Sequence, residues 1–385
     1  MKIKEIIKAF IPSGLLYLNR TFFLKYFINN FRKNSEIFYV RENSVLIIEF
    51  FDFHGEVCPG LVKYLLDLGF NVDIVFCKHK TGRNDPGLFR CFDENEKVRI
   101  KTLSDVNMNL LLRSSLSYKY KHIILTSFTD DMGREQLYKV DLFKLKIVCM
   151  MHKSGIMHEY FRTNKIISMV KMDCINRKSP LIVNSHYFGK FEENNKSETT
   201  TFFTLNTGEL YRRNLYLLFD ASDRLYENGI NNFIVKIIGK GINIPEKYSG
   251  NFQILGCLDF QAMYKEISES DFILALIDQA SVQYTNKASG SYALSYGFLK
   301  PLLLHIKFSD ISGFNSDNSV LYYDNDDLSN AMKKCIDMSN SDYLSLVSSL
   351  KSSEKKLYDI SLDNLKKVLE TPIQFLSQNR PTIGY

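Results

Sequence analysis

Three glycine-bearing turns in the second half of the chain are suited to holding a phosphorylated ligand. They contain Gly208, Gly239 and Gly256, each just after an apolar run, and Asp259 follows the last of them. Glycine at the end of a strand lets the backbone approach a ligand closely. One such turn says little, because any strand-to-helix turn can use glycine, but three in succession predict a ligand site.

Cationic and small polar residues accompany these turns. Arg212 and Arg213 stand at the expected start of a helix, where guanidinium groups and unpaired backbone amides suit a diphosphate. Lys287 precedes Ser289, Gly290 and Ser291, which have the composition of a second helix start. Together they predict a phosphate cradle. The alternatives are solvated charge for the arginines and an ordinary capped helix for the serines.

Candidates for acid–base chemistry lie in the first half of the chain. His152 follows an apolar run, where a neutral imidazole could hydrogen-bond a ligand or accept a proton. His54 and Glu56 follow the first apolar run, where either could position or deprotonate a substrate hydroxyl. The alternative is a structural role at the strand ends.

The metal-binding patterns are weak. The segment 324–326 matches a D-x-D metal–diphosphate pattern, but it opens a helical stretch, where aspartate is favoured as an N-cap. Cys77, His79 and Cys91 lack a zinc spacing. We therefore expect no metal and no cofactor.

The elements that must position these residues are short apolar runs alternating with longer mixed segments, which is typical of buried parallel strands and their covering helices. The strands expected first are 44–50, 71–76, 121–126, 146–151 and 180–184, with a helix over 58–68. Those expected next are 201–205, 233–239, 252–256, 271–276, 301–304 and 319–323, with helices over 213–227, near 289–297 and within 326–370.

This pattern predicts an α/β fold with two Rossmann-like, doubly wound domains facing across a cleft. The polar stretch 192–198 separates the two series, so the expected domains are 42–195 and 196–340, followed by C-terminal helices over 341–385. Ligands of open parallel sheets bind beyond the carboxyl ends of the strands. The residues named above should therefore meet at the cleft.

Composition narrows the class of protein. A chain of 385 residues can build two cores, and 45% hydrophobic residues exclude disorder. No apolar run is long enough to span a bilayer, and no signal peptide is visible. Seven cysteines without C-x-x-C spacing indicate a reducing cytoplasm. No G-x-G-x-x-G follows the first strand of either series, and no basic stripe with stacking residues is present, which disfavours dinucleotide chemistry and nucleic-acid binding.

The basic charge is concentrated at the N-terminus. Within the segment 1–41, residues 1–34 carry seven Lys or Arg against one acid, interleaved with aliphatic and aromatic side chains. This composition is typical of a segment that lies on an anionic membrane surface. The alternative is a helical extension packed on the first domain.

In the order of these pieces, residues 44–340 resemble the GT-B glycosyltransferases, in particular the retaining type of bacterial surface-polysaccharide synthesis. The resemblance rests on the strand and serine turn of 179–188, the strand and glycine turn of 203–208 with Arg213 and Asn214, the turns 237–241 and 254–256, and the segment 293–301. Glu209 stands where the family usually has arginine, and the family's pair of glutamates seven residues apart is missing, so the stereochemistry stays open.

The resemblance implies transfer of a hexose-type sugar from a nucleoside-diphosphate sugar to a saccharide acceptor. The composition of the N-terminal segment adds the expectation that this acceptor grows on a lipid carrier at the inner face of the membrane. It places the diphosphate near Arg212, Arg213 and residues 289–291, the base near Gly256 to Asp259, and His152 beside the transferred sugar. Two rivals stay open: a nucleotide-sugar epimerase of the same fold, and a non-catalytic sugar-binding or scaffold subunit.

Overall fold

The structure is a computed structural model, which describes residues 39–50, 55–77, 86–104, 107–108, 111–112, 117–127, 146–152, 165–171, 180–192, 194–205, 213–239, 241, 243–280, 284 and 287–372. The first 38 residues, on which the prediction of a membrane-binding segment depends, lie outside these ranges. Within them, no helix combines the length and apolar character needed to cross a membrane.

The first domain is built on a parallel sheet with the strand order β3-β2-β1-β4-β5-β6-β7. Its strands are β1 (Ser44–Glu49), β2 (Asn71–Cys77), β3 (Val98–Leu103), β4 (His122–Leu125), β5 (Ile147–Met151), β6 (Ile166–Ser168) and β7 (Leu181–Ile182). Helix α3 (Cys58–Asp67) and the short turns η2 (Gly55–Val57), η3 (Pro86–Phe92) and η4 (Ser117–Lys119) belong to the same domain. Strand β1 is buried throughout, as expected for a central strand covered on both faces.

The second domain repeats this plan with the strand order β10-β9-β8-β11-β12-β13, again parallel. Its strands are β8 (Thr200–Leu205), β9 (Phe233–Ile238), β10 (Phe252–Gly256), β11 (Phe272–Leu274), β12 (Leu302–His305) and β13 (Val320–Tyr322). The helices are α6 (Leu215–Glu227), α7 (Phe260–Ser268), α8 (Gly290–Phe298), α9 (Ser309–Ser312) and α10 (Leu328–Asp337), with short turns η6 (Glu246–Tyr248), η8 (Ile306–Phe308) and η9 (Asn325–Asp327). Two parallel sheets with flanking helices confirm the predicted fold class.

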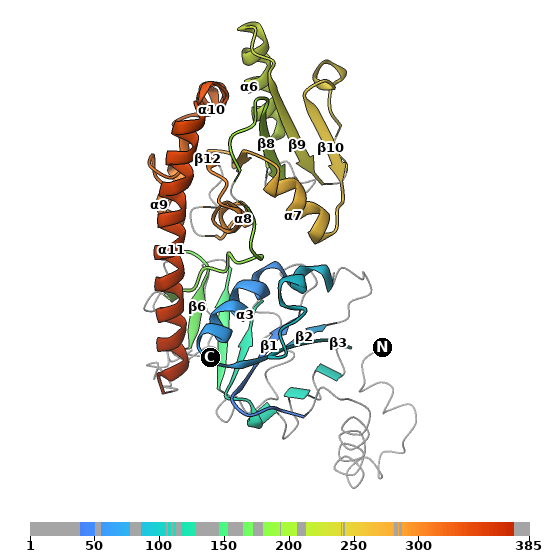
Figure 1. The fold of residues 1–385 in the computed structure, drawn as a ribbon, viewed down its shortest axis with the longest axis vertical. Coiled ribbons are helices and arrows are strands. Elements are labelled where there is room, and N and C mark those ends of the chain that lie inside the picture. The colour runs from blue at the N-terminus through green and yellow to red at the C-terminus, as the bar shows by residue number, and fades with distance from the viewer. Residues whose placement is uncertain are drawn as a thin grey trace, which may run out of the picture.

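Helix α11 (Asn340–Glu370) leaves the second domain and runs back along the first, so that the last described element packs beside β6 and β7 (Figure 1). The buried Lys165, just before β6, donates hydrogen bonds to the carbonyls of Val368 (2.8 Å) and Leu369 (3.0 Å). These are terminal carbonyls that a helix cannot pair within itself. The first domain is therefore completed by helix α11.

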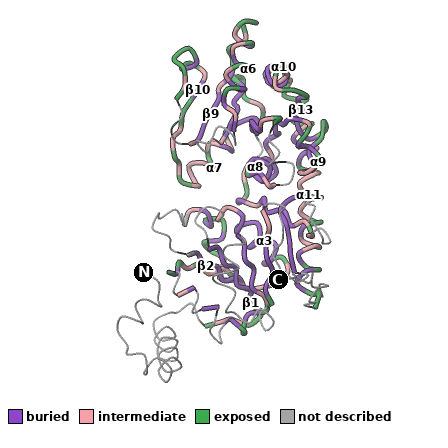
Figure 2. The backbone as a smooth tube through the Cα atoms, turned by 180° about the vertical axis from the view of Figure 1, so that it is seen from behind, coloured by how far each residue is buried: buried purple, intermediate pink, exposed green. Residues whose placement is uncertain are grey.

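The segment 183–190 connects the domains and is held between two helices. The hydroxyl of Tyr64 in α3 donates to the carbonyl of Asn184 at 2.6 Å, and the buried His186 contacts Glu354 of α11 at 2.8 Å. One continuous hydrophobic cluster includes residues of both α3 and α8. Figure 2 shows buried backbone in both domains, including α3 and α8. The two domains thus share part of their core.

Helix α8 (Gly290–Phe298) matches the helix predicted near 289–297, and Gly297 does not form the turn that ends it. The left-handed residue at its end is Leu299, with φ of 53°. A Cβ at position 297 would lie 2.3 Å from the carbonyl oxygen of His186. Gly297 is therefore required for close approach to the connecting segment and not for the turn.

Candidate functional site

The glycine turns of the second domain lie side by side at the carboxyl ends of its strands. The amide of Gly239, after β9, donates to the carbonyl of Gly256 at the end of β10 (2.9 Å). Gly256 has φ of 68°, and the space that a Cβ would occupy there is open. Asp259 caps helix α7 and accepts from the amide of Ala262 at 2.8 Å, so this carboxylate has a structural bond at the predicted base site. Gly208 lies outside the described residues.

Arg213 connects the first helix start to the second. Its guanidinium Nη2 donates to the hydroxyls of Ser289 (2.9 Å) and Ser291 (3.1 Å) at the beginning of α8, and its Cζ lies 5.5 Å from the ring centroid of Tyr284. The residue is 5% exposed. The serine hydroxyls predicted to face an anion therefore also accept bonds from an arginine, which fixes that cation beside the free amides of the helix start. The other predicted arginine, Arg212, lies outside the described residues.

Lys287 lies at the entrance to the same helix. Its ammonium nitrogen is 5.8 Å from the centroid of the Tyr284 ring, on which Arg213 also packs. Gly290 is the first residue of α8, and its missing side chain leaves open space. The structure thus brings together five residues of the predicted phosphate cradle: Arg213, Lys287, Ser289, Gly290 and Ser291.

A buried polar cluster lies around Arg213 at the carboxyl ends of β12 and β13. Within the described residues, the hydroxyls of Tyr292 and Tyr322 have no hydrogen-bond partner, while the His305 ring lies near the backbone of Tyr323. The His305 and Tyr322 rings meet edge-on with centroids 5.4 Å apart. Burial lowers the pKa of His305, which favours the neutral imidazole, and burial raises the pKa of both tyrosines. Unsatisfied groups of this kind cost stability and call for an explanation.

Replacement of Tyr322 by Phe should stabilise the protein. The change removes a buried hydroxyl while it keeps the ring against His305, and a buried polar group without a partner costs about 1–3 kcal/mol. We expect the free energy of unfolding in urea to rise by about 1 kcal/mol. An equally large loss would show instead that the hydroxyl is satisfied, for example by an ordered water.

The first domain contributes His152, directly after β5. A carbonyl oxygen can only accept, so the 2.6 Å contact between His152 Nε2 and the carbonyl of Thr126 is an N–H···O bond. Nε2 therefore carries the proton, and in the neutral ring Nδ1 is the accepting nitrogen. The predicted acid–base role of His152 thus has a defined tautomer.

His152 also touches the phosphate cradle of the other domain. Its carbonyl accepts from the amide of Ala288 at 3.0 Å, and Ala288 immediately precedes the helix start that Arg213 holds. A second bond between domains, from Gln261 of α7 to the carbonyl of Gly87, is 2.5 Å long. Candidate residues that are far apart in the sequence therefore meet where the two sheets present their carboxyl ends.

The other predicted residues of the first domain are less well placed. Glu56 is half-buried in η2. Burial of the Cys58 thiol is the main cause of its raised pKa, and the negative charge of Glu56 adds to the effect. His54 lies outside the described residues. In the second domain, Asp324 of the D-x-D segment caps η9, as predicted, and Asp326 pairs with Arg224 at 2.5 Å.

Sequence reasoning missed Glu49, the last residue of β1. It is fully buried, and its Oε2 accepts from the hydroxyls of Thr126 (2.5 Å) and Ser127 (2.7 Å). A charged residue inside the apolar run 44–50 was the available signal, because an ionisable group is rarely buried without a partner.

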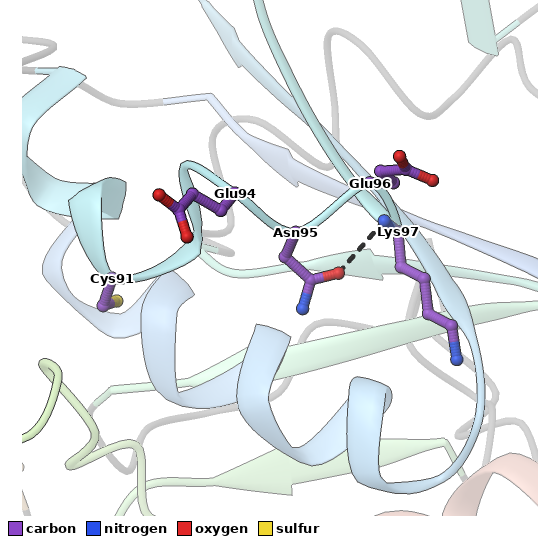
Figure 3. Close-up of a pocket in the computed structure, with 5 residues that line it drawn as sticks. All are labelled: Cys91, Glu94, Asn95, Glu96 and Lys97. Carbon is purple, nitrogen blue, oxygen red and sulfur yellow. Dashed lines mark hydrogen bonds between the residues drawn. The ribbon is translucent and has the colours of Figure 1, made fainter.

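An open hollow of about 450 Å³ lies elsewhere, in the turn that joins η3 to β3 (Figure 3). It is lined by Cys91, Glu94, Asn95, Glu96 and Lys97, none of which is a predicted site residue. It lies at the amino end of β3, whereas ligands of parallel sheets bind at the carboxyl ends. We therefore do not assign the site to this hollow.

Comparison with known proteins shows the fold. No protein-family model matches the chain, and neither does any curated protein. Among solved structures, TarM is 8% identical with a TM-score of 0.59 and covers 88% of this chain and 100% of its own. AviGT4, a glycosyltransferase of avilamycin A biosynthesis, is 10% identical with a TM-score of 0.56, over 86% of this chain and 99% of its own. An alpha-glucosyltransferase in complex with UDP and DNA is 12% identical with a TM-score of 0.54, over 85% and 99%.

These solved structures are glycosyltransferases of the GT-B architecture, and the likeness extends over both domains. At such low identity it establishes the fold and not the reaction. The resemblance noted in the sequence is confirmed at that level: the chain has the GT-B fold, with two Rossmann-like domains that meet at the carboxyl ends of their parallel strands.

Proposed function

We propose that this protein is a glycosyltransferase that moves a hexose-type sugar from a nucleoside diphosphate to a saccharide acceptor. The observation that carries the proposal is the contact between His152 and Ala288. This backbone bond sets His152, whose imidazole has a defined tautomer, beside a cationic helix start in the other domain. A reaction that breaks a sugar–diphosphate bond needs both a partner for a hydroxyl and stabilisation of the departing charge.

In this proposal the departing diphosphate is stabilised by the amides at the start of α8, with Arg213 and Lys287 beside them. Groups fixed before the reaction stabilise developing charge without a cost of reorganisation. They would serve in place of a metal ion. Nδ1 of His152 would accept a hydrogen bond from a sugar hydroxyl.

The bound ligands of similar structures support this substrate class. A structure of S. aureus TarM contains UDP, alpha-GlcNAc-glycerol and fondaparinux, and has a TM-score of 0.61 to this chain. An E. coli structure with a TM-score of 0.51 contains UDP-2-fluoro glucose. We extend the proposal to a lipid-linked acceptor of surface-polysaccharide synthesis, reached from the cytoplasmic face through residues 1–34, because of their basic amphipathic composition.

Thermal unfolding against UDP, GDP, CDP and ADP tests the donor site. A ligand selective for the folded state at 100 times its Kd raises the free energy of unfolding by about 2.7 kcal/mol. We expect one nucleoside diphosphate to raise Tm, and its sugar conjugate to be hydrolysed slowly without acceptor. Binding without hydrolysis or transfer would favour the scaffold alternative, and the absence of any Tm shift would contradict the proposal.

A further inference from the structure

Burial of the Glu49 carboxylate costs free energy, and the sheet does not need a carboxylate at this position. It is 0% exposed at the end of a strand whose other residues are chiefly aliphatic. A buried carboxylate costs several kcal/mol unless hydrogen bonds compensate for lost hydration. An aliphatic residue of similar size would fill this place in β1 without that cost. The carboxylate therefore calls for a role beyond packing.

The hydrogen bonds of Glu49 lead to the neighbouring strand. Both Thr126 and Ser127, directly after β4, donate their hydroxyls to the same oxygen, Oε2. Strands β1, β4 and β5 are adjacent in the sheet, so the three strand ends lie next to one another. Two bonds to one carboxylate oxygen hold the 126–127 peptide at the carboxyl edge of the sheet.

Thr126 joins Glu49 to His152. Its hydroxyl donates to Glu49, while its carbonyl accepts the Nε2 proton of His152 at 2.6 Å. The carbonyl of His152 in turn accepts from Ala288 of the second domain. The contacts run from a buried carboxylate, through one threonine, to the imidazole of His152, and the backbone carbonyl of the same residue bonds Ala288 beside the phosphate cradle.

We propose that Glu49 is a positioning residue that holds the Thr126 carbonyl and thereby keeps His152 as the Nε2–H tautomer, with Nδ1 as the acceptor for a ligand hydroxyl. The role assigned to Nδ1 rests on the proposed function. The tautomer and its dependence on Glu49 do not, so the two can fail separately.

The primary variants are Glu49→Leu and Glu49→Gln. Leucine keeps the volume but removes both acceptor oxygens, while glutamine keeps one oxygen that can accept from the two hydroxyls. The carbonyl of Ile48 lies 3.1 Å from the same hydroxyl, so it can accept the single hydroxyl proton once Glu49 is replaced by leucine. Should Glu49→Leu fail to fold, Thr126→Val removes the bond to Glu49 and keeps the carbonyl.

Two-bond proton–nitrogen NMR of protein labelled with ¹⁵N-histidine reports the tautomer directly, and a His152→Gln variant assigns the signal. We expect a single Nε2–H tautomer in the wild type and in Glu49→Gln, and a mixture in Glu49→Leu. A folded Glu49→Leu protein with an unchanged His152 signal would overturn the proposal, as would a wild-type ring protonated on Nδ1 alone.

Asp73 supplies a matched control. It is likewise a fully buried carboxylate of the first sheet, but its partners are Arg41, Arg99 and Tyr120, and none of these contacts leads to His152. Asp73→Asn should lower stability and leave the His152 signal unchanged. A shift of that signal in Asp73→Asn would mean that any loss of stability disturbs the ring, and would overturn the specific role of Glu49.

Activity separates the two proposals. With a donor identified, Glu49→Leu should lower kcat on the order of tenfold with little change in donor KM, a fraction of the 10²–10⁴ that positioned proton transfer contributes. Glu49→Gln should recover most of this loss. If the tautomer depends on Glu49 but no nucleoside diphosphate binds, the positioning role stands and the glycosyltransferase proposal fails. If a donor reacts while the tautomer is independent of Glu49, the glycosyltransferase proposal stands and the positioning role fails.

Discussion

Arg213→Ala is expected to abolish stabilisation by the nucleoside diphosphate and to lower kcat/KM for its sugar conjugate about 10²–10³-fold, the cost of removing one preorganised donor. The loss has two parts. The cation beside the start of α8 disappears, and the hydroxyls of Ser289 and Ser291 lose the guanidinium that orients them. Thermal shifts and initial rates measured on the same preparations check both parts.

Two further variants test whether the loss in Arg213→Ala is specific to this guanidinium. Arg213→Lys keeps the charge but cannot reproduce the planar fork that reaches both serines, so we expect an intermediate loss. Arg224→Ala removes an arginine of the same domain whose side chain is 46% exposed and paired with Asp326, and such surface pairs contribute about 0–1 kcal/mol. Equal ligand binding in Arg213→Ala and the wild type would remove Arg213 from the donor site.

Gly297→Ala should destabilise the protein by about 3 kcal/mol, at the upper end of the cost of overpacking. The new Cβ would lie 2.3 Å from the carbonyl oxygen of His186 and 2.5 Å from Cδ2 of Phe188. The connecting segment cannot retreat, because Tyr64 holds the carbonyl of Asn184, and at Gly60 of α3 a Cβ would already lie 2.8 Å from Cα of Ser185. Urea unfolding measures the effect.

Gly290→Ala is the control within the same helix. Nothing lies within 4 Å of a Cβ at that position, and alanine favours a helix by about 1 kcal/mol relative to glycine. Helix propensity therefore predicts that Gly290→Ala and Gly297→Ala are both neutral or stabilising. Packing predicts instead that only Gly297→Ala is destabilising. Equal stability of the two variants would show that the domains can separate enough to admit a methyl group.

The central strands could be predicted because burial on both faces leaves an uninterrupted apolar run. The run 44–50 became β1 (Ser44–Glu49) and 201–205 became β8 (Thr200–Leu205), within a residue at each end. Strand β3 (Val98–Leu103) was missed. It lies at the edge of the sheet, where Arg99 and Lys101 alternate with apolar residues and interrupt the hydrophobic pattern. Strand β6 was missed because it is only Ile166–Ser168.

The candidate site was predictable where it depends on strand ends, and unpredictable where it depends on contacts between domains. Glycine turns and helix starts have local signatures, which led to Gly256 and Ser289. The burial of Arg213 against two serines, and the bond from Ala288 to His152, join residues more than 70 positions apart. No local pattern encodes such pairs. Glu49 was visible as an anomaly, but its partners follow from the order of strands in the sheet.

The return of α11 to the first domain has a consequence for biosynthesis. As the chain leaves the ribosome, residues 44–182 emerge long before Asn340–Glu370, so β6 and β7 must wait for the helix that covers them. Because translation adds about 5–20 residues per second, the apolar side of this nascent domain is exposed for many seconds. The second domain forms in the meantime. The first domain is therefore synthesised first but completed last, and it is the part that chaperones of unfinished chains would hold longest.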